Sequence, residues 1–399
     1  MANLNILIIY RHYWPDTPPY ASMLKTLAEG YVLAGHNVTI LTEQPCHKIY
    51  AGTVSDKWAN GISVVRLSKL PFFNKSGVVR NLDTAIFPIR ALFKSALLRL
   101  RGNIFDYVIS ATIPPVINGF FASLAASILN AKFIYHVQDI YPEIAISSNM
   151  IKERSFIKSV LQALEYFTTK RMHLAVVLSG DMKNTIVSRG VSEHKIEIIN
   201  NFMLESFESE AQEEKAAVEP IDYFSLIFAG NIGRFQGLET FVEAVKLSKL
   251  EDKIQLHLLG DGHALESLKL LANQHPCIKF LPRVNYEKAQ KLIENADLGI
   301  VSIEESIEKL AYPSKIMTYL GLGTPIITTI SKSSEIGNFL ESTGTGVCVC
   351  RDPQEIYSVI KAISGDKIKI ESMSGEAINV FNKNFTPNVA IAKWLDILK

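Results

Sequence analysis

The apolar positions of the first 200 residues alternate between two periods. Short, dense runs of Ile, Val and Leu predict buried strands, whereas apolar residues spaced three or four apart predict helices. Strands are expected at 6–10, 38–42, 62–67, 107–110, 132–137, 174–178 and 196–199. Helices are expected between them, at 21–34, about 80–100, 118–129, 155–172 and 182–189. This alternation predicts a parallel sheet with helices on both faces.

The pattern breaks once and then restarts. Residues 205–219 are dominated by Glu, Ala, Gln, Lys and Ser and hold no apolar period, which is typical of a solvated linker. Beyond this break, helical stretches separate further expected strands at 226–228, 255–259, 278–280, 298–301, 326–329 and 346–349. A chain of 399 residues also exceeds what a single core usually organises.

We therefore expect an α/β protein with two doubly wound, Rossmann-like domains that face a central cleft. The N-terminal domain would span 1–203, the linker 204–220 and the C-terminal domain 221–380. A last helix within 381–399 would pack back on the N-terminal domain. Ligands of such sheets bind beyond the carboxyl ends of the strands, so both sets of loops can serve one cleft.

The composition indicates the cellular compartment in which the protein resides. The cysteines Cys46, Cys277, Cys348 and Cys350 show no metal-ligand spacing, and a reducing cytoplasm suits them. The chain opens directly on an expected strand, with no signal peptide, and no uncharged apolar run reaches the ~18 residues of a membrane span. We expect a cytoplasmic protein.

Charge is distributed unevenly along the chain. Residues 1–200 carry 21 Lys and Arg against 13 Asp and Glu, a net charge of +8, and residues 201–399 carry 20 against 27, a net charge of −7. A basic half is compatible with nucleic-acid binding. However, the segment from Lys57 to Arg101 interleaves nine basic residues, and the single acid Asp83, with large apolar side chains, which argues for lipid and against nucleic acid.

The segment 78–101 carries the strongest part of this pattern. Its basic residues accompany Phe87, Leu92, Phe93, Leu97 and Leu98, and they are Arg80, Arg90, Lys94, Arg99 and Arg101. A helix with this profile is typical of docking on an anionic membrane surface. A solvated basic face over ordinary core positions is the competing interpretation.

A glycine-rich turn in the second half indicates an anion site. An apolar run at 223–228 precedes the turn, and helical spacing at 238–245 follows it. Between them lie Gly230, Gly233 and Gly237, with Arg234 and Gln236 inside the turn. Glycines let the backbone approach a ligand, and the amides at a helix start point toward an anion. An ordinary strand–helix turn with glycines for packing remains the alternative.

Further polar segments lie where other strands should end. They occupy 13–16 with 18–21, 136–143, 260–262, 281–284 and 313–325. Each has a plain structural explanation: Asp261 can cap a turn, Ser314 can start a helix and His136 can be a satisfied strand histidine. Their order and spacing along the whole chain make a common function more plausible than several separate coincidences.

Taken together, these segments resemble a known enzyme family. The relevant motifs are Gly-His-Asn-Val-Thr at 35–39, His-x-Gln-Asp at 136–139, Leu-Ser-Gly-Asp-Met at 178–182, Ile-Ile-Asn-Asn at 198–201, Gly-Asn-Ile-Gly-x-x-Gln-Gly-Leu-Glu at 230–239, Leu-Gly-Asp-Gly at 259–262, Ala-Asp at 296–297 and Pro-Ser-Lys at 313–315. The set resembles the retaining, metal-independent glycosyltransferases of family 4, which have the two-domain GT-B fold. The turn at 230–239 is similar to the subgroup that builds bacterial exopolysaccharide and O-antigen, including colanic acid transferases.

The resemblance implies a substrate pair and roles for residues. The donor would be a nucleotide-diphosphate sugar, with no separate cofactor and no metal, and the acceptor a saccharide, in particular a polyprenyl-diphosphate-linked one at the inner face of the plasma membrane. Arg234 and Lys315 would hold the diphosphate, Arg283 would border the base, and Gln138 and Asp139 would face the acceptor or the sugar. The other donor-binding positions would be Gly230, Asn231, Gly233, Gln236, Gly260, Gly262, Pro313, Ser314 and Thr318.

This sequence also departs from the family pattern. The usual Gly-Gly after the first strand is Pro18-Pro19-Tyr20, and the two glutamates of the Glu-x7-Glu signature are Leu310 and Thr318. Upstream carboxylates could replace the first of these, and the candidates are Glu304, Glu305 and Glu308. The family's basic pair aligns with Asn231 and Gln236, and its N-terminal-site histidine aligns with Gln138. Two further functions therefore stay open: a catalytically weakened binding or regulatory protein, and a GT-B nucleotide-sugar 2-epimerase.

Overall fold

The computed structural model describes residues 3–16, 18–45, 57–58, 61–68, 77–148, 150–203 and 223–399, with backbone only at 57–58 and 77–83. Its contacts divide the chain into two compact units. The first comprises Met1–Asn200, Leu310–Tyr312 and Pro387–Lys399, and the second comprises Asn201–Lys309 and Pro313–Thr386. The sequence placed these boundaries at residues 203 and 381. The predicted linker, 204–220, lies outside the described residues.

The first unit is built on an eight-stranded sheet. Its order is β3-β4-β2-β1-β5-β6-β7-β8, and all neighbours run parallel except the antiparallel pair β3–β4. The strands are β1 (Asn5–Ile9), β2 (Asn37–Glu43), β3 (Lys57–Trp58), β4 (Ile62–Leu67), β5 (Tyr107–Ala111), β6 (Lys132–Val137), β7 (Leu174–Val177) and β8 (Ile196–Ile198). Central strands such as β5 are buried along their whole length, as expected of a parallel sheet covered on both faces.

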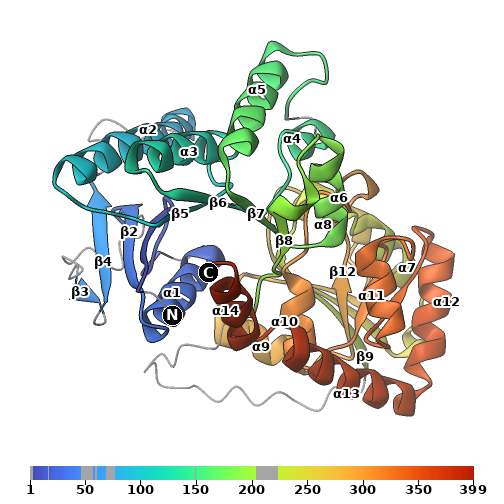
Figure 1. Ribbon diagram of the computed structural model, residues 1–399. Helices are drawn as coiled ribbons and strands as arrows, with labels where there is room; N and C mark the ends of the chain where they lie inside the picture. The colour runs from blue at the N-terminus through green and yellow to red at the C-terminus, as the bar shows by residue number, and fades with distance from the viewer. Residues whose placement is uncertain are drawn as a thin grey trace. The chain divides into compact units, whose positions relative to one another are not determined.

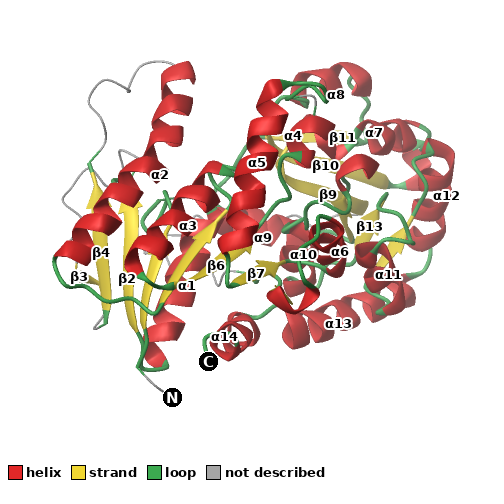
Figure 2. Cartoon of the chain, turned by 45° about the horizontal axis from the view of Figure 1, so that its top comes forward, coloured by secondary structure: helices red, strands yellow, loops and turns green. Residues whose placement is uncertain are grey.

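Helices cover both faces of this sheet (Figure 2). On one side α2, α3 and α5 pack in sequence, and on the other α1 packs against the last helix, α14 (Figure 1). The helices are α1 (Pro19–Leu33), α2 (Gly77–Leu100), α3 (Ile117–Leu129), α4 (Glu143–Ser147), α5 (Phe156–Arg171), α6 (Gly180–Ser188) and α14 (Pro387–Asp396). Pro19 suits the first helical position of α1, because proline is pre-set for helical φ and needs no N–H partner there.

The second unit repeats this design with a fully parallel sheet of six strands. The order is β11-β10-β9-β12-β13-β14, with β9 (Phe224–Asn231), β10 (Ile254–Asp261), β11 (Ile278–Leu281), β12 (Leu298–Val301), β13 (Ile326–Thr328) and β14 (Gly346–Cys348). Its helices are α7 (Glu239–Lys246), α8 (Leu265–Ala272), α9 (Tyr286–Glu294), α10 (Lys315–Gly321), α11 (Glu335–Ser342), α12 (Pro353–Ser364) and α13 (Lys367–Asn384).

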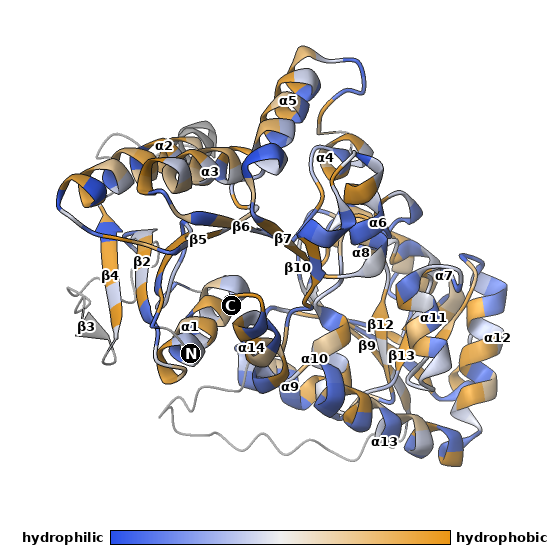
Figure 3. Cartoon of the chain, viewed as in Figure 1, coloured by the Kyte–Doolittle hydropathy of each residue, from blue (hydrophilic) through white to orange (hydrophobic). Residues whose placement is uncertain are grey.

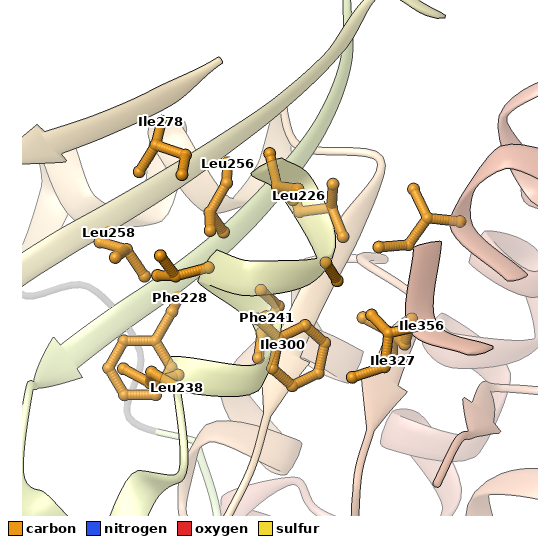
Figure 4. Packing of buried hydrophobic residues seen from close by; sticks show 14 of the residues in the cluster. Leu226, Phe228, Leu238, Phe241, Leu256, Leu258, Ile278, Ile300, Ile327 and Ile356 are labelled. Atoms are coloured by element: carbon orange, nitrogen blue, oxygen red, sulfur yellow. The ribbon is translucent and has the colours of Figure 1, made fainter. Parts of the chain in front are cut away.

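An apolar core packs the second sheet against α7, α8 and α12. Leu226 and Phe228 of β9, with Leu256 and Leu258 of β10, pack on Phe241 of α7 (Figure 4). Because these strand residues alternate, the neighbouring positions point to the opposite face. The core therefore fixes the register in which β9 and β10 end.

Strand order also marks where a ligand should bind. After β9 the chain moves outward to β10 and β11, then returns to place β12 on the other side of β9. This reversal is a topological switch point, and doubly wound sheets bind ligands beyond the carboxyl ends of the strands that flank it. In this unit the flanking strand β9 ends at Gly230 and Asn231, inside the glycine turn.

Candidate functional site

The ends of β9 and β10 are joined into one platform. Their pairing continues to the last residues, with Gly260 opposite Gly230 and Asp261 opposite Asn231. The Ile232 N–H then donates to the Asp261 carbonyl at 2.9 Å, and the Ala264 N–H donates to the Ile232 carbonyl at 3.0 Å. The two predicted motifs, at 230–239 and 259–262, are therefore neighbours along the carboxyl edge of the sheet.

Two glycines make this close approach possible. A Cβ on Gly260 would lie 1.9 Å from the Gly230 carbonyl oxygen, and a Cβ on Gly262 would lie 2.2 Å from the Ile232 carbonyl oxygen. Their φ angles, +140° and +157°, are also in the region that side chains rarely adopt. Both glycines are thus required by the backbone of the platform itself.

Lys315 points its ammonium group at this platform. It is the first residue of α10, and its Nζ lies 4.5 Å from the centroid of the Phe228 ring. A Cβ built on Gly230 would meet the Lys315 Cε at 3.2 Å and its Nζ at 3.3 Å. The predicted pair of Gly230 and Lys315 is therefore brought into contact, although 85 positions separate them in the sequence (315 − 230).

The electrostatics of Lys315 indicate a site for an anion. Burial lowers the pKa of the Lys315 ammonium to about 8, and no neighbouring carboxylate opposes that effect. Within the described ranges, Lys315 forms no ion pair with Asp or Glu; its contact is with the face of Phe228. Lys315 is half-buried, and a cation partly removed from water without a counter-charge is destabilised, which a bound anion would relieve.

Tyr319, which the sequence analysis missed, lies one helical turn beyond Lys315. Its hydroxyl accepts a hydrogen bond from the Ala229 N–H at 3.0 Å, and its ring fills the space above Gly299 in β12. Burial raises the pKa of Tyr319 above its usual range, so the hydroxyl keeps its proton. The spacing of four residues after Lys315 was the available signal, because residues at i and i+4 share one helix face.

The remaining predicted donor residues surround the platform. Arg234 is exposed in the short helix η3 (Arg234–Gln236), which also holds Gln236. The Asn231 Nδ2 lies 3.0 Å from where a Cβ of Gly233 would stand. Arg283 is exposed just after the edge strand β11. The others lie at the start of α10, where the Thr318 hydroxyl donates to the Ser314 carbonyl at 3.4 Å and Pro313 precedes the helix.

The carboxylates considered as replacements for the missing glutamates have different surroundings. Glu304 lies 4.0 Å from Arg351, whose guanidinium also donates to the Ile303 carbonyl. Glu308 is buried and accepts a hydrogen bond from the Ser331 N–H at 3.3 Å. Glu305 is exposed at the start of η5 (Glu305–Ile307). Glu304 is the one that neighbours the glycine turn, because a Cβ on Gly237 would lie 3.5 Å from its Oε1.

The first unit places its predicted residues at the end of β6. His136 is buried and hydrogen-bonds through Nδ1 to the Tyr20 hydroxyl and through Nε2 to the Gln138 amide, each at 2.7 Å. Burial lowers the pKa of His136 to about 3, so the ring is neutral and donates one of these bonds while accepting the other. Its ring also lies edge-on to Trp394 of α14, at 4.9 Å between centroids.

Asp139 comes directly after Gln138, and backbone hydrogen bonds fix its position. Asp139 forms an antiparallel bridge with Ala311, and the next N–H, of Ile140, donates to the Leu310 carbonyl at 2.9 Å. Burial raises the pKa of the Asp139 carboxyl to about 6. The family departure at 18–20 also acquires a role here, because Tyr20 is the partner of His136.

The fold and the paired glycine turns define a two-domain GT-B protein, and family comparisons specify which kind. The family described as "Glycosyl transferase 4-like domain" matches residues 20–201, and the one described as "Glycosyl transferases group 1" matches residues 223–366. The two matches span both units. The chain belongs to the family 4 glycosyltransferases with the GT-B fold, and the resemblance predicted from the motifs is confirmed.

Individual relatives agree with this assignment. WbjE of Pseudomonas aeruginosa, named as a glycosyltransferase, is 26% identical over 333 residues, covering 82% of each chain. WcaI of Escherichia coli (strain K12), named as a colanic acid biosynthesis glycosyl transferase, is 22% identical over 379 residues, covering 90% of this chain and 91% of its own. The crystal structure of Anabaena HepE in complex with UDP superposes with a TM-score of 0.70 at 13% identity, covering 99% of each chain.

Proposed function

We propose that this glycosyltransferase moves a sugar from a nucleotide-diphosphate donor to a lipid-linked saccharide, with retention of anomeric configuration and without a metal, during bacterial surface polysaccharide synthesis. The observation that carries the proposal is the Lys315 ammonium, which lies against the Gly230 turn at the switch point and has a pKa lowered by burial alone. A leaving diphosphate would supply the negative charge that this position lacks.

The comparisons support the substrate classes without fixing them. The relative WcaI is named for colanic acid biosynthesis, and the structurally similar HepE was crystallised with UDP. By analogy, a uridine nucleotide is the first donor class to test. A polysaccharide repeat built on a lipid carrier is the corresponding acceptor class.

The chemistry can be assigned to residues of this chain. As the bond from the anomeric carbon to the diphosphate breaks, negative charge grows on the leaving oxygen, and Lys315 with Arg234 would stabilise it electrostatically. The backbone of the glycine turn leaves room for the diphosphate to lie close. The acceptor hydroxyl oxygen would bond to the same face of the anomeric carbon and give its proton to the leaving phosphate oxygen. Gln138 and Asp139 would orient the acceptor or the sugar.

Substitution of the two cations tests this assignment. We expect Arg234→Ala and Lys315→Ala each to lower turnover at least ~10-fold, since loss of one preorganised charge contact commonly costs ~3 kcal/mol of barrier. The measurement is transfer, or donor hydrolysis, with a panel of UDP-, GDP- and dTDP-sugars. Lys279→Ala is the matched control, because Lys279 is an exposed lysine on β11 of the same unit. Wild-type rates in both folded variants would show that the diphosphate binds elsewhere.

A binding or regulatory role is the second candidate, and one observation favours it. Neither signature position carries a carboxylate: Leu310 packs with the first unit, and Thr318 bonds within α10. Donor binding without any turnover across the panel would support this role. Interconversion of the donor sugar at its second carbon, followed by NMR, would instead identify an epimerase.

In the structure, fewer residues of the segment 78–101 are available to contact a membrane than the sequence predicted. Phe87 and Leu98 are buried, so the prediction that they face lipid is wrong. Arg90 also turns inward, with its guanidinium 3.3 Å from Glu43. Among the described side chains of this helix, Ile89, Phe93, Leu97 and Leu100 are apolar and exposed. The side chain of Arg80 lies outside the described residues.

The exposed part of α2 still supports peripheral attachment. Phe93 is 67% and Leu100 82% exposed, and Arg99 and Arg101 lie beside them with no acid in the last two turns. Considering only the described part of the chain, none of the helices is both long and apolar enough to cross a bilayer. We therefore propose that the enzyme works at the cytoplasmic face of the membrane, where its lipid-linked acceptor would be.

A further inference from the structure

Helix α5 exposes large apolar side chains, whereas Leu161 and Leu164 on its inner side are half-buried. The two residues of α5 that are buried are polar, Glu165 and Thr168. Its exposed residues include Phe156 at 83%, Ile157 at 59% and Phe167 at 48%. A surface helix normally turns its apolar stripe inward, so an exposed apolar stripe marks a face that something else covers.

Three of the exposed apolar residues share one side of α5. Phe156, Val160 and Phe167 are spaced at i, i+4 and i+11, which places them on a single stripe at 3.6 residues per turn. Val160 is 39% exposed, and Ala163, at i+7, continues the stripe as an exposed residue. In Figure 3 apolar segments interrupt α5 along its length, and Figure 1 shows its outer turns standing clear of the sheet.

Polar contacts hold the helix in this orientation. The Glu165 carboxylate accepts a hydrogen bond from the Tyr135 hydroxyl at 3.4 Å and lies 3.9 Å from the Arg189 guanidinium. Arg189 is further bonded to Glu143 and to the Tyr141 carbonyl. Rolling the apolar stripe inward would break these contacts and leave a buried carboxylate and guanidinium without partners, which is strongly unfavourable.

Basic residues frame the exposed stripe at both ends. Lys152 and Arg154 precede the helix and are exposed, whereas Lys170 and Arg171 close it. The Lys170 Nζ lies over the Tyr166 ring at 5.3 Å, and the Arg171 guanidinium lies over the Phe167 ring at 5.6 Å. The exposed acid of this segment, Glu153, is already paired with Lys158. Aromatic rings with adjoining cations are typical of residues at a membrane interface.

We propose that α5 docks on an anionic phospholipid surface, with Phe156, Val160 and Phe167 in the interface and Lys170 and Arg171 at the headgroups. A second copy of this chain is the other occupant of an apolar stripe, but pairing two such faces would oppose like charges. A surface of anionic lipid headgroups complements them instead.

This inference extends the proposed membrane attachment to an element with no membrane signal in the sequence analysis. Helix α3 packs against both α2 and α5, so the three helices form one layer over the first sheet (Figure 1). Docking through both outer helices would orient the first unit, which the proposed function assigns to a lipid-linked acceptor. Two attachment points restrict rotation at the surface more than one does.

Vesicle co-sedimentation of the full chain tests the proposal directly. The vesicles are phosphatidylcholine containing phosphatidylglycerol, with pure phosphatidylcholine for comparison. We expect wild-type binding to the anionic vesicles that weakens with salt, and a reduction of about tenfold in the double variant Phe156→Ser/Phe167→Ser. Lys170→Glu/Arg171→Glu should weaken binding at low salt. Leu270→Ser is the matched control, because Leu270 is 82% exposed on α8 of the other unit.

Each outcome decides between the occupants. Loss of binding in the α5 variants, with binding kept by Leu270→Ser, supports docking on lipid. Undiminished binding by the folded double variant, or no wild-type binding at low salt, overturns it. A dimer in sedimentation velocity that Phe156→Ser/Phe167→Ser dissolves would assign the face to a second copy. Donor hydrolysis is measured without vesicles, so its absence in the wild type would count against the proposed function and not against docking.

Discussion

Lys315 combines a poorly solvated position with the proposed role of holding the donor diphosphate. Its Nζ lies over an aromatic face and against the Gly230 backbone, and burial lowers its pKa to about 8. A lysine has an unperturbed pKa of ~10.4, so this side chain loses its charge in the free protein at a much lower pH than an exposed lysine does. A bound diphosphate would restore the charged form.

This pKa predicts the pH dependence of donor binding. Below about pH 8 the free enzyme carries the Lys315 charge, and above it the charge is lost, so kcat/KM for the donor should fall as the pH rises through about 8. The free enzyme's groups govern this profile. Lys315→Arg should keep its charge and move the decline to higher pH. A profile that is flat from neutral to strongly alkaline pH would show that Lys315 does not meet the donor.

The same group predicts the opposite slope for stability. Its folded pKa lies below the unfolded value, so between the two values the unfolded chain binds more protons than the folded one. The contribution of Lys315 to the free energy of unfolding therefore rises with pH in that window, while donor affinity falls. Denaturant melts of the wild type and Lys315→Met, compared at each pH, separate the two effects.

At the scale of the element, α10 connects β9 to the position proposed for the diphosphate. Lys315 and Tyr319 project from one helix face, and their contacts fall on consecutive residues of β9: the Phe228 ring, the Ala229 N–H and Gly230. The Tyr319 hydroxyl therefore sets the distance between the helix and the last residues of the strand.

The variant Tyr319→Phe tests whether the hydrogen bond between Tyr319 and Ala229 positions α10. Removing the hydroxyl leaves the Ala229 N–H without its partner, which should cost about 1–3 kcal/mol of stability. If the bond also positions Lys315, kcat/KM for the donor should fall several-fold and the alkaline decline near pH 8 should shift. Tyr357→Phe is the control. Tyr357 lies on α12, and its hydroxyl donates a hydrogen bond to the Asp252 carboxylate at 2.8 Å. Equal stability losses in both variants with unchanged kinetics would reduce Tyr319 to a packing residue.

The elements themselves were largely predictable from the sequence. Apolar runs located β4, β6 and β12 at their observed bounds, since buried parallel strands leave an unbroken hydrophobic signal. The glycine turn and the Pro-Ser-Lys segment were also recognised. The sequence did not predict which face of α2 turns inward. Phe87 and Phe93 belong to the same predicted helix, but Phe87 is buried and Phe93 is 67% exposed.

Long-range partners were the other gap. Leu310 and Ala311 pair with the backbone at Ile140 and Asp139, although they lie between residues of the second unit. The partnership of Tyr20 with His136 joins positions 116 residues apart. Such contacts depend on the folded topology, and neither local propensity nor spacing encodes them. The inward carboxylate of Glu165 was hidden for the same reason.

At the scale of the whole molecule, the distribution of charge agrees with the proposal that the N-terminal part contacts the membrane and the C-terminal part binds the donor. The first 200 residues carry +8 and the remainder −7. Anionic lipid would attract the first part and repel the second. Electrostatics thus favours contact of the first part, which includes the proposed docking helices α2 and α5, with an anionic surface.

The charge available to the donor leads to the last prediction. A diphosphate leaving group needs positive charge from a metal ion or from side chains, and this chain places Lys315 and Arg234 at the glycine turn. We therefore expect transfer to continue after treatment with EDTA, with no gain from added Mg²⁺ or Mn²⁺. In Lys315→Ala, where the charge is missing, a divalent ion that accompanies the diphosphate should restore part of the lost rate. Loss of wild-type activity in EDTA and its recovery with Mg²⁺ or Mn²⁺ would contradict the metal-free mechanism. A rate in Lys315→Ala that metal leaves unchanged would show that this lysine does more than neutralise charge.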